Sequence, residues 1–144
     1  VWRRSDSASF NAGTPAWETV LDIDALSEAE GENWVYEGAH CYGAPSDRCM
    51  IELSRGGTDS SVYREFSLKN KAFVDGGFVV PEAKSNVSWL DQDTLLVGTD
   101  WGEGALTQAG YARDIRVWHR GEPLSAATSV FEGDVEDTQV SPVI

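Results

Sequence analysis

Basic residues, methionine, histidine and cysteine are scarce in this sequence of 144 residues. Eleven Lys and Arg residues face 24 Asp and Glu residues, which gives a formal net charge of −13. A chain this acidic repels phosphate backbones and anionic lipid headgroups, so we expect no nucleic acid and no membrane as a partner. No run approaches the roughly 20 apolar residues that span a bilayer, and no apolar segment follows residues 1–4 as a signal peptide requires. Because the chain begins without methionine, inside a strand-like stretch, we expect a piece of a longer protein.

The residue types that carry most enzyme chemistry are few and scattered. No serine lies in the G-x-S-x-G pattern of an α/β-hydrolase, and the only histidines are His40 and His119. Both fall in or at the end of expected strands, which favours a structural role over that of a general base. A zinc site made from His40, Cys41 and Cys49 would be one ligand short. The sequence therefore assigns no catalytic, cofactor-binding or metal-ligating residue, and we expect no cofactor.

The two cysteines flank a loop rich in Gly, Pro, Ser and Asp. Cys41 and Cys49 can therefore face each other across a hairpin, close enough for a disulfide. The interpretation we favour is two half-buried thiols in a reducing cytosol, and the disulfide is the alternative. The expected compartment is the cytoplasm, with the periplasm as the alternative.

The acidic residues form no recognisable calcium-binding or catalytic pattern. Asp91 and Asp93 fall between two expected strands, where turn aspartates usually accept hydrogen bonds from backbone amides, and the calcium-loop pattern D-x-D-x-D-G is not completed. Glu28, Glu30 and Glu32 are expected to form a solvated charged run. Paired carboxylates for glycoside hydrolysis remain an alternative, because sequence spacing favours no particular pair.

A β-hairpin is predicted at the centre of the chain. Residues 49–54 and 61–68 are rich in β-branched, aromatic and aliphatic side chains, and Gly56 and Gly57 between them supply the positive φ that a tight reversal needs. Neither face of the second strand is wholly polar. This pattern suits a sheet packed between other sheets.

Strand-like segments recur with a period of about 55 residues, which is typical of solenoids, propellers and arrays. Each repeat contains four strands. The first strand is expected at residues 33–39, 86–91 and 138–144, and the second at 49–54 and 94–99. The third is expected at 1–4, 62–66 and 117–120, and the fourth at 17–22, 71–74 and 127–132. Four antiparallel strands joined by Gly and Asp turns make one propeller blade.

The predicted fold is therefore all-β, a partial β-propeller of roughly two to three four-stranded antiparallel blades within one domain. The expected units are the outer strands of one blade in residues 1–32, blades at 33–84 and 85–137, and the start of another at 138–144. Because such a set of blades does not close a ring, its strand edges stay unpaired. We expect the isolated piece to associate or to be marginally stable.

Two segments depart from the strand pattern. A short acidic helix is predicted over residues 23–31, where Asp24 can cap the first turn and Gly31 can end it, and we expect it to decorate a loop. Residues 100–113 are glycine-rich and are expected to loop out between two strands.

The tryptophans are expected to divide into a packed set and one exposed residue. Large rings within strands fill the space between neighbouring blades. The tryptophans that lie in or begin expected strands are Trp2, Trp17, Trp34, Trp89 and Trp118. Trp101 lies in the irregular insertion instead, where we expect it to be exposed and available to a partner.

Three long segments carry a family resemblance. They are LSRGGTDSSVYREFSL at residues 53–68, NVSWLDQDTLLVGTDWG at 86–102 and GYARDIRVWHRGEPL at 110–124. Together with residues 17–39 they resemble the amino-terminal propeller of bacterial prolyl oligopeptidase-like serine peptidases, over nearly the whole chain. Ala112 departs from the family pattern, where proline is expected, and this difference alters only a loop.

The resemblance implies a two-domain enzyme in which a seven-bladed propeller covers an α/β-hydrolase domain that bears a Ser, Asp and His triad. Such enzymes hydrolyse short peptides, typically after proline, and the propeller excludes folded proteins. On this resemblance the partners of the chain are the hydrolase domain of the same parent and a short peptide. The triad lies outside the 144 residues, so the chain alone is expected to be inert.

The resemblance also places two parts of the chain near the substrate. Residues 34–39 and 87–91 would line the tunnel, and the family's substrate pocket lies near residues 84–86. An aromatic residue that some relatives carry there is not matched by Ser85, so no binding role is transferred to it.

A second hypothesis is a non-enzymatic propeller or sandwich module that binds a protein or a glycan. Its support is the absence of catalytic residues and the expected exposure of Trp101. A downstream G-x-S-x-G in the parent gene would favour the peptidase, whereas further blades alone would favour the binding module.

Overall fold

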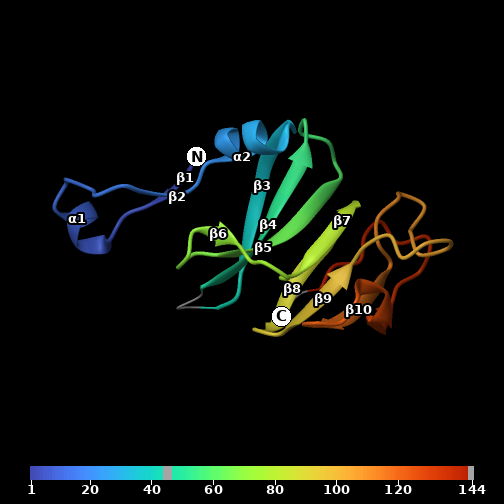
Figure 1. Cartoon of the computed structure of the whole chain (residues 1–144). Coiled ribbons are helices and arrows are strands. Elements are labelled where there is room, and N and C mark those ends of the chain that lie inside the picture. The colour runs from blue at the N-terminus through green and yellow to red at the C-terminus, as the bar shows by residue number, and fades with distance from the viewer. Residues whose placement is uncertain (44–46, 143–144) are drawn as a thin grey trace.

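The computed structural model describes residues 1–43 and 47–142, and its described elements form three antiparallel sheets with a few short helices (Figure 1). The strands are β1 (Trp2–Arg4), β2 (Glu18–Leu21), β3 (Trp34–Cys41), β4 (Arg48–Arg55), β5 (Ser61–Ser67), β6 (Ala72–Phe73), β7 (Val79–Ala83), β8 (Asn86–Asp91), β9 (Thr94–Gly98), β10 (Asp114–His119) and β11 (Thr128–Glu132). The helices are α1 (Ser7–Asn11), α2 (Ile23–Glu30) and a 3₁₀ turn at Leu124–Ala126.

The two larger sheets are meanders of sequential strands. The first has the order β3-β4-β5-β6, with β7 also paired to β5, and the second has the order β8-β9-β10-β11. This arrangement confirms the predicted all-β fold and its partial propeller, since a blade is a four-stranded antiparallel meander. The expected unit limits at residues 33–84 and 85–137 stay predictions.

The predicted central hairpin is present. β4 and β5 pair from Ser54 opposite Ser61 to Arg48 opposite Ser67, and Gly56 and Gly57 between them have φ of 67° and 78°. These left-handed angles are accessible to glycine without steric cost.

The outer strand of the first sheet is divided into two pieces, and the second piece was not predicted. β6 pairs with the end of β5, whereas β7 pairs with its beginning, where Val80 lies opposite Tyr63. Between them a turn returns the chain to β5, through hydrogen bonds from Val74 N to Glu65 O and from Phe78 N to the Glu65 carboxylate. Pro81 interrupts the alternating pattern within β7, which hides this strand from sequence reasoning.

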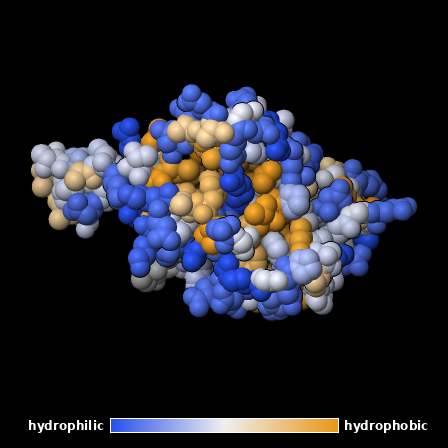
Figure 2. All heavy atoms as spheres, viewed as in Figure 1, coloured by the Kyte–Doolittle hydropathy of each residue, from blue (hydrophilic) through white to orange (hydrophobic). Residues whose placement is uncertain are grey.

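Both faces of the first sheet are covered by apolar cores. The core between the two larger sheets includes Met50, Tyr63, Phe78, Val80, Val87, Trp89, Leu95, Val97, Trp118 and Ala127. The core on the other face, which we call the second core, includes Val20, Leu21, Ile23, Trp34, Cys49, Ile51, Leu53 and Phe66. Figure 2 shows hydrophobic residues gathered near the middle of one face of the molecule, within a largely hydrophilic surround. The sheets are thus stacked face to face, as the two-sided pattern of the central hairpin predicts.

Four of the five tryptophans that were predicted to pack do so, and three of these four are buried. The predictions for Trp17 and Trp101 are wrong. Trp34, Trp89 and Trp118 are 6 to 8% exposed, and Trp2 packs against the second core. Trp17 is 55% exposed, because it precedes β2 at the base of a protruding arm, where its ring lies 6.4 Å from that of Phe10 in a T-shaped arrangement.

Trp101 reverses the other prediction, since it is partly buried against the core between the sheets. Its indole N–H donates to the Asp114 carbonyl oxygen at 2.8 Å, and the Arg116 guanidinium lies 4.4 Å from the ring centre. The irregular backbone of residues 100–113 is confirmed apart from one isolated bridge, but it folds this ring inward.

The predicted helix exists as α2, with different details at its start. Asp22 caps it in place of Asp24, and its carboxylate accepts hydrogen bonds from the backbone N–H groups of Asp24 and Ala25. Gly31, with φ of 65°, ends the helix as predicted. Ile23 is buried and Leu26 packs on the second core, so α2 covers the first sheet rather than decorating a loop.

The glutamates at the end of α2 are also not a merely solvated run. Glu30 accepts a hydrogen bond from the Trp34 indole and pairs with Arg64, while Glu32 pairs with Arg55. These contacts join α2 to the first sheet.

A second helix, α1, was not predicted and lies in an arm that extends away from the two larger sheets, at the left of Figure 1. Asp6 caps α1 by accepting from Ser9 N at 2.8 Å. The base of the arm is fixed by Glu18, which pairs with both Arg4 and Lys71.

The predicted strand at residues 138–144 is wrong for residues 138–142, and its last two residues lie outside the described part. Residues 138–142 run without a ladder partner across the free face of the second sheet, where the Asn86 amide donates to the Val140 carbonyl oxygen at 3.1 Å. In the described ranges, no helix has the length and apolar character needed to cross a bilayer.

Candidate channel wall

The first strands of the two larger sheets lie in contact. β3 is the terminal strand of the first sheet and β8 the terminal strand of the second, so each has one edge without a ladder partner among the described residues. These are the strands that the family resemblance predicts to line a tunnel. We call β3 and β8 together the channel wall.

Trp89 joins the two strands of the channel wall. Its indole N–H donates to the His40 carbonyl oxygen at 2.8 Å, and its ring lies 6.1 Å from that of Tyr42. Because Trp89 is itself buried in the core between the sheets, the end of β3 is fixed to that core.

The cysteines beside this contact form a disulfide, so the favoured interpretation of two free thiols is wrong. Cys41 and Cys49 are direct partners in the β3–β4 ladder, which brings the two sulfur atoms together without moving the backbone. Cys49 is fully buried within the second core, whereas Cys41 is exposed. Sequence alone left this choice open, because the register of the two strands decides it.

A β-bulge lies in the middle of β3. The register of β3 against β4 shifts between Tyr36 and Gly38, so Glu37 is the extra residue. Bulges commonly redirect a side chain next to a functional site. Here the Glu37 carboxylate is turned to accept from the Ser54 hydroxyl at 2.6 Å, and Tyr36 is left 40% exposed.

A polar cluster links β3 with β4 and β5 behind the channel wall. His40 Nε2 lies 3.0 Å from Glu52 Oε2, and this hydrogen bond lowers the pKa of the Glu52 carboxyl more than partial burial raises it. Burial, with the nearby Glu52 charge, raises the pKa of Tyr63. The Tyr63 hydroxyl therefore stays protonated and donates to the Ser85 carbonyl oxygen at 2.9 Å.

The segment at residues 84–86 is held by neighbouring loops. Lys84 Nζ lies 2.7 Å from Asp59 Oδ2, which lowers the pKa of Asp59 and raises that of Lys84, and its ammonium lies 5.0 Å from the Tyr111 ring centre. The Ser85 hydroxyl bonds Thr99 Oγ1 at 2.6 Å. Both side chains are thus engaged in structural contacts.

A buried carboxylate joins the two sheets at the opposite end of the core from this segment. The Glu65 side chain is fully buried and accepts two hydrogen bonds from Arg120, at 2.8 and 3.0 Å. Arg120 also bonds Asp93 Oδ1 at 2.7 Å, and these carboxylates raise the Arg120 pKa. Sequence analysis missed this contact, since the two partners lie 55 residues apart.

The turn that carries Asp93 is as predicted. Asp91 accepts a hydrogen bond from the Asp93 backbone N–H at 2.8 Å, which is the expected role of a turn aspartate. His119 lies at the end of β10, and its Nδ1 is 3.3 Å from the Thr94 hydroxyl oxygen. In the residues that the structure places, no three His, Cys, Asp or Glu side chains are grouped so as to hold a metal ion.

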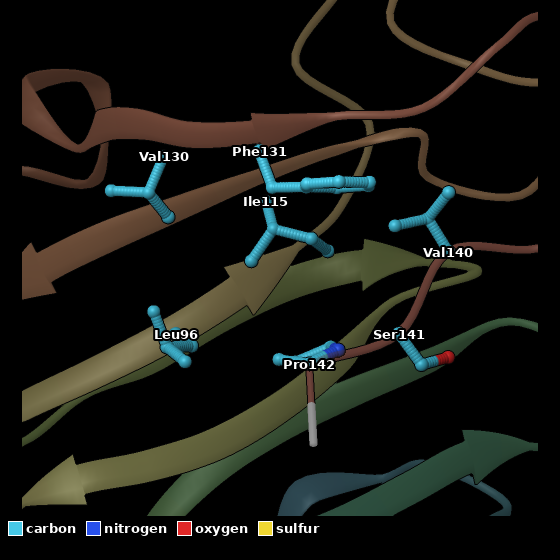
Figure 3. Close-up of a pocket in the computed structure, with 7 residues that line it drawn as sticks. All are labelled: Leu96, Ile115, Val130, Phe131, Val140, Ser141 and Pro142. Atoms are coloured by element: carbon cyan, nitrogen blue, oxygen red, sulfur yellow. The ribbon is translucent and has the colours of Figure 1, made fainter. Parts of the chain in front are cut away.

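The second sheet carries an apolar hollow on its far face (Figure 3). It has a volume of about 310 Å³ and is lined by Leu96, Ile115, Val130, Phe131, Val140, Ser141 and Pro142. Val130 and Phe131 remain 57% and 59% exposed there. We call this surface the far face.

Comparison with known families now bears on this geometry. Residues 1–142 match the family model described as the prolyl oligopeptidase N-terminal beta-propeller domain. The chain belongs to the prolyl oligopeptidase family, as part of its N-terminal propeller domain. The family resemblance drawn from three sequence segments is therefore confirmed.

Two relatives are named as uncharacterized peptidases. One, from Sinorhizobium fredii, is 44% identical over 137 residues, which cover 95% of this chain and 19% of the relative. The other, from Rickettsia prowazekii, is 31% identical over 150 residues, which cover 98% of this chain and 21% of the relative.

A solved structure has the same fold. A post-proline cleaving enzyme from Rickettsia typhi superposes with a TM-score of 0.87 and 30% sequence identity, over 96% of this chain and 21% of that enzyme. The chain of this prolyl oligopeptidase-family propeller thus spans about a fifth of the length of the proteins it matches.

Proposed function

We propose that this chain is the gating part of a serine peptidase that hydrolyses short proline-containing peptides. The observation that carries the proposal is the contact between β3 and β8, the terminal strands of the two larger sheets. In a propeller the first strand of every blade lies next to the axis, so adjoining first strands would form the wall of a central channel. The name of the Rickettsia typhi enzyme supports cleavage after proline.

The chemistry of the channel wall suits a filter. Tyr36 on β3 and Leu90 on β8 are 40% and 49% exposed, so both strands present bulky side chains to solvent. The Trp89 contact and the disulfide hold the end of β3 in one position. A wall fixed in this way admits a thin, extended peptide and excludes a folded protein, without itself reacting with the substrate.

The reaction is assigned to another domain of the parent. We propose an α/β-hydrolase domain in which a serine, activated by a histidine base, attacks the peptide carbonyl while backbone N–H groups hold the oxyanion. The proposed blade units are residues 33–84 and 85–137, with outer strands of an earlier blade in 1–32. In this proposal the far face of the second sheet meets the blade that continues the chain.

We propose the cytoplasm as the compartment, with the periplasm as the alternative. A disulfide in a cytosolic protein is usually transient and redox-sensing, whereas in the periplasm it persists. The state of Cys41 and Cys49 in protein isolated under acid quench therefore separates the two.

The experiment compares the full-length parent with this chain alone. The parent should hydrolyse a chromogenic peptide with proline before the scissile bond, and replacement of the serine of its G-x-S-x-G by alanine should abolish turnover. Residues 1–144 alone should show none. Turnover by the isolated chain, or a parent gene that encodes only further blades, would contradict the proposal.

The alternative, a non-enzymatic binding module, has less support. Its structural support was an exposed Trp101, and that ring is packed beneath Arg116 with its N–H bonded to Asp114.

A further inference from the structure

The Cys41–Cys49 disulfide lies at the point where the channel wall is fixed to the core. It closes the β3–β4 hairpin at the end of β3, between His40 and Tyr42, which are the residues that contact Trp89. On the far side of the disulfide, a hydrogen bond from Tyr42 N to Arg48 O at 3.0 Å continues the pairing. The disulfide is thus a covalent restraint on the end of this strand.

The two sulfur atoms differ in accessibility. Cys41 is exposed, whereas Cys49 is fully buried among the apolar residues Ile51, Leu53 and Phe66 of the second core. A thiol in solution can therefore approach the disulfide from the Cys41 side. Exchange proceeds by attack of a thiolate on an accessible sulfur, so this asymmetry makes Cys41 the sulfur that is attacked.

We propose that Cys41 and Cys49 form a redox-modification site that controls the width of the channel, an inference that rests on the proposed gating function. The co-reactant is a dithiol reductant. Its thiolate attacks Cys41 Sγ, the S–S bond breaks, and the electron pair leaves on Cys49 sulfur, which takes up a proton. The second thiol of the reductant then displaces the Cys41 thiolate, which is also protonated, and the reductant becomes a disulfide.

Reduction acts on the wall through the Trp89 contact. Without the covalent closure, the end of β3 separates more readily from β4, and the His40 carbonyl and Tyr42 ring move with it. Trp89 stays in the core between the sheets, so its hydrogen bond to His40 is weakened. The channel therefore stays narrow in the disulfide-bonded protein. In the reduced protein the channel is wider and admits longer peptides.

The test uses the full-length parent in its oxidised state and after treatment with a dithiol. Differential alkylation and mass spectrometry report the state of the peptides that contain Cys41 and Cys49. The kcat/KM for a long proline-containing peptide, relative to that for a short one, should rise about fivefold on reduction. Amide hydrogen exchange at residues 39–42 should become faster at the same time.

Two variants sharpen the test. A Cys41→Ser, Cys49→Ser double variant should show the relaxed ratio without reductant and should not respond to it. Trp89→Phe keeps an aromatic ring but removes the donor to His40, so its ratio should be relaxed in the oxidised state and should rise less on reduction. If either variant fails to fold, the reversible change in the wild-type protein still decides the matter.

The outcomes separate this inference from the proposed function. Cysteines that are not joined in the oxidised protein, or a length preference and exchange rates that are the same in both states, would overturn the redox site. A different result would be faster exchange at residues 39–42 on reduction in a folded parent that cleaves neither peptide. That result would support redox control of the end of β3 and would contradict the proposed peptidase activity.

Discussion

The two faces of the second sheet differ sharply, although the same four strands make both. Toward the first sheet, Trp89, Leu95 and Trp118 are at most 7% exposed, whereas on the far face Val130 and Phe131 are more than half exposed. On β9 the alternation of side chains places Leu95 in the core and Leu96 in the hollow of the far face. This chain covers the inner face of the second sheet, but it covers the far face only in part, with residues 138–142. The apolar side chains that stay exposed there are typical of a surface that a further element covers.

The largest effect is expected on the covered face. Trp118→Ala should lower the free energy of unfolding by about 3–5 kcal/mol, because it removes a buried ring that packs edge-on against Phe78 and leaves a cavity. Chemical denaturation of the parent and of the isolated chain should give similar losses. As the matched variant, Phe131→Ala should cost little in the isolated chain but much more in the parent. Equal costs of Phe131→Ala in both would contradict the proposal that another blade covers the far face.

The next effect concerns the buried ion pair between the sheets. Glu65→Leu should destabilise the chain by about 3 kcal/mol, because it removes the acceptor for Arg120 and for the Phe78 backbone N–H. Thermal unfolding of the single variants and of a Glu65→Leu, Arg120→Met double variant measures the coupling. The double variant should be more stable than Glu65→Leu alone. The exposed Glu18→Gln serves as control and should change the midpoint little, since surface pairs contribute little.

These two contacts show what the sequence could predict and what it could not. The alternation in β5 and the glycines before it determine the hairpin locally, so this part was predictable. Glu65 and Arg120 meet only because the sheets stack, and nothing within a few residues of either one signals the pair. The predictions that Trp101 is exposed and that Trp17 is packed are wrong for the same reason. The course of a loop and the direction of an arm depend on tertiary contacts.

The candidate channel wall was predictable only by resemblance. The repeat groups residues 33–39 and 86–91 as equivalent strands, but their place along a tunnel came from the family resemblance. The disulfide and the Glu37 bulge depend on the register between β3 and β4, and a shift of one residue would remove both. Register is a property of the paired strands, so a single strand's pattern does not contain it.

A smaller effect is expected on association of the isolated chain. The far face exposes a hollow lined mainly by apolar side chains, and exposed apolar patches with free strand edges favour self-association. Phe131→Asp should shift residues 1–144 toward the monomer in sedimentation velocity experiments. Phe10→Asp, on the protruding arm and equally exposed, is the matched control and should leave the distribution unchanged. A wild-type chain that is monomeric at all concentrations, with a high melting temperature, would contradict this prediction.

The smallest effect is a pH dependence that the polar cluster behind the channel wall confers and the apolar far face lacks. The pKa of Glu52 is lowered in the folded chain, chiefly by the hydrogen bond from His40, so its ionised form stabilises the fold. This stabilisation is fully present above the unfolded pKa of Glu52. It is lost as the pH falls from there through the lowered folded value.

Glu52→Gln should therefore flatten the fall in unfolding free energy on acidification, as measured by denaturant titrations across the acidic range. His40→Phe should flatten it by a similar amount, because it removes the main cause of the lowered pKa. Phe131→Ala should leave the slope unchanged, since none of the described residues that line the hollow of the far face is titratable. If the Glu52 and Phe131 variants had the same acid slope, the polar cluster would contribute nothing to stability, and the end of β3 would be held by Trp89 and the disulfide alone.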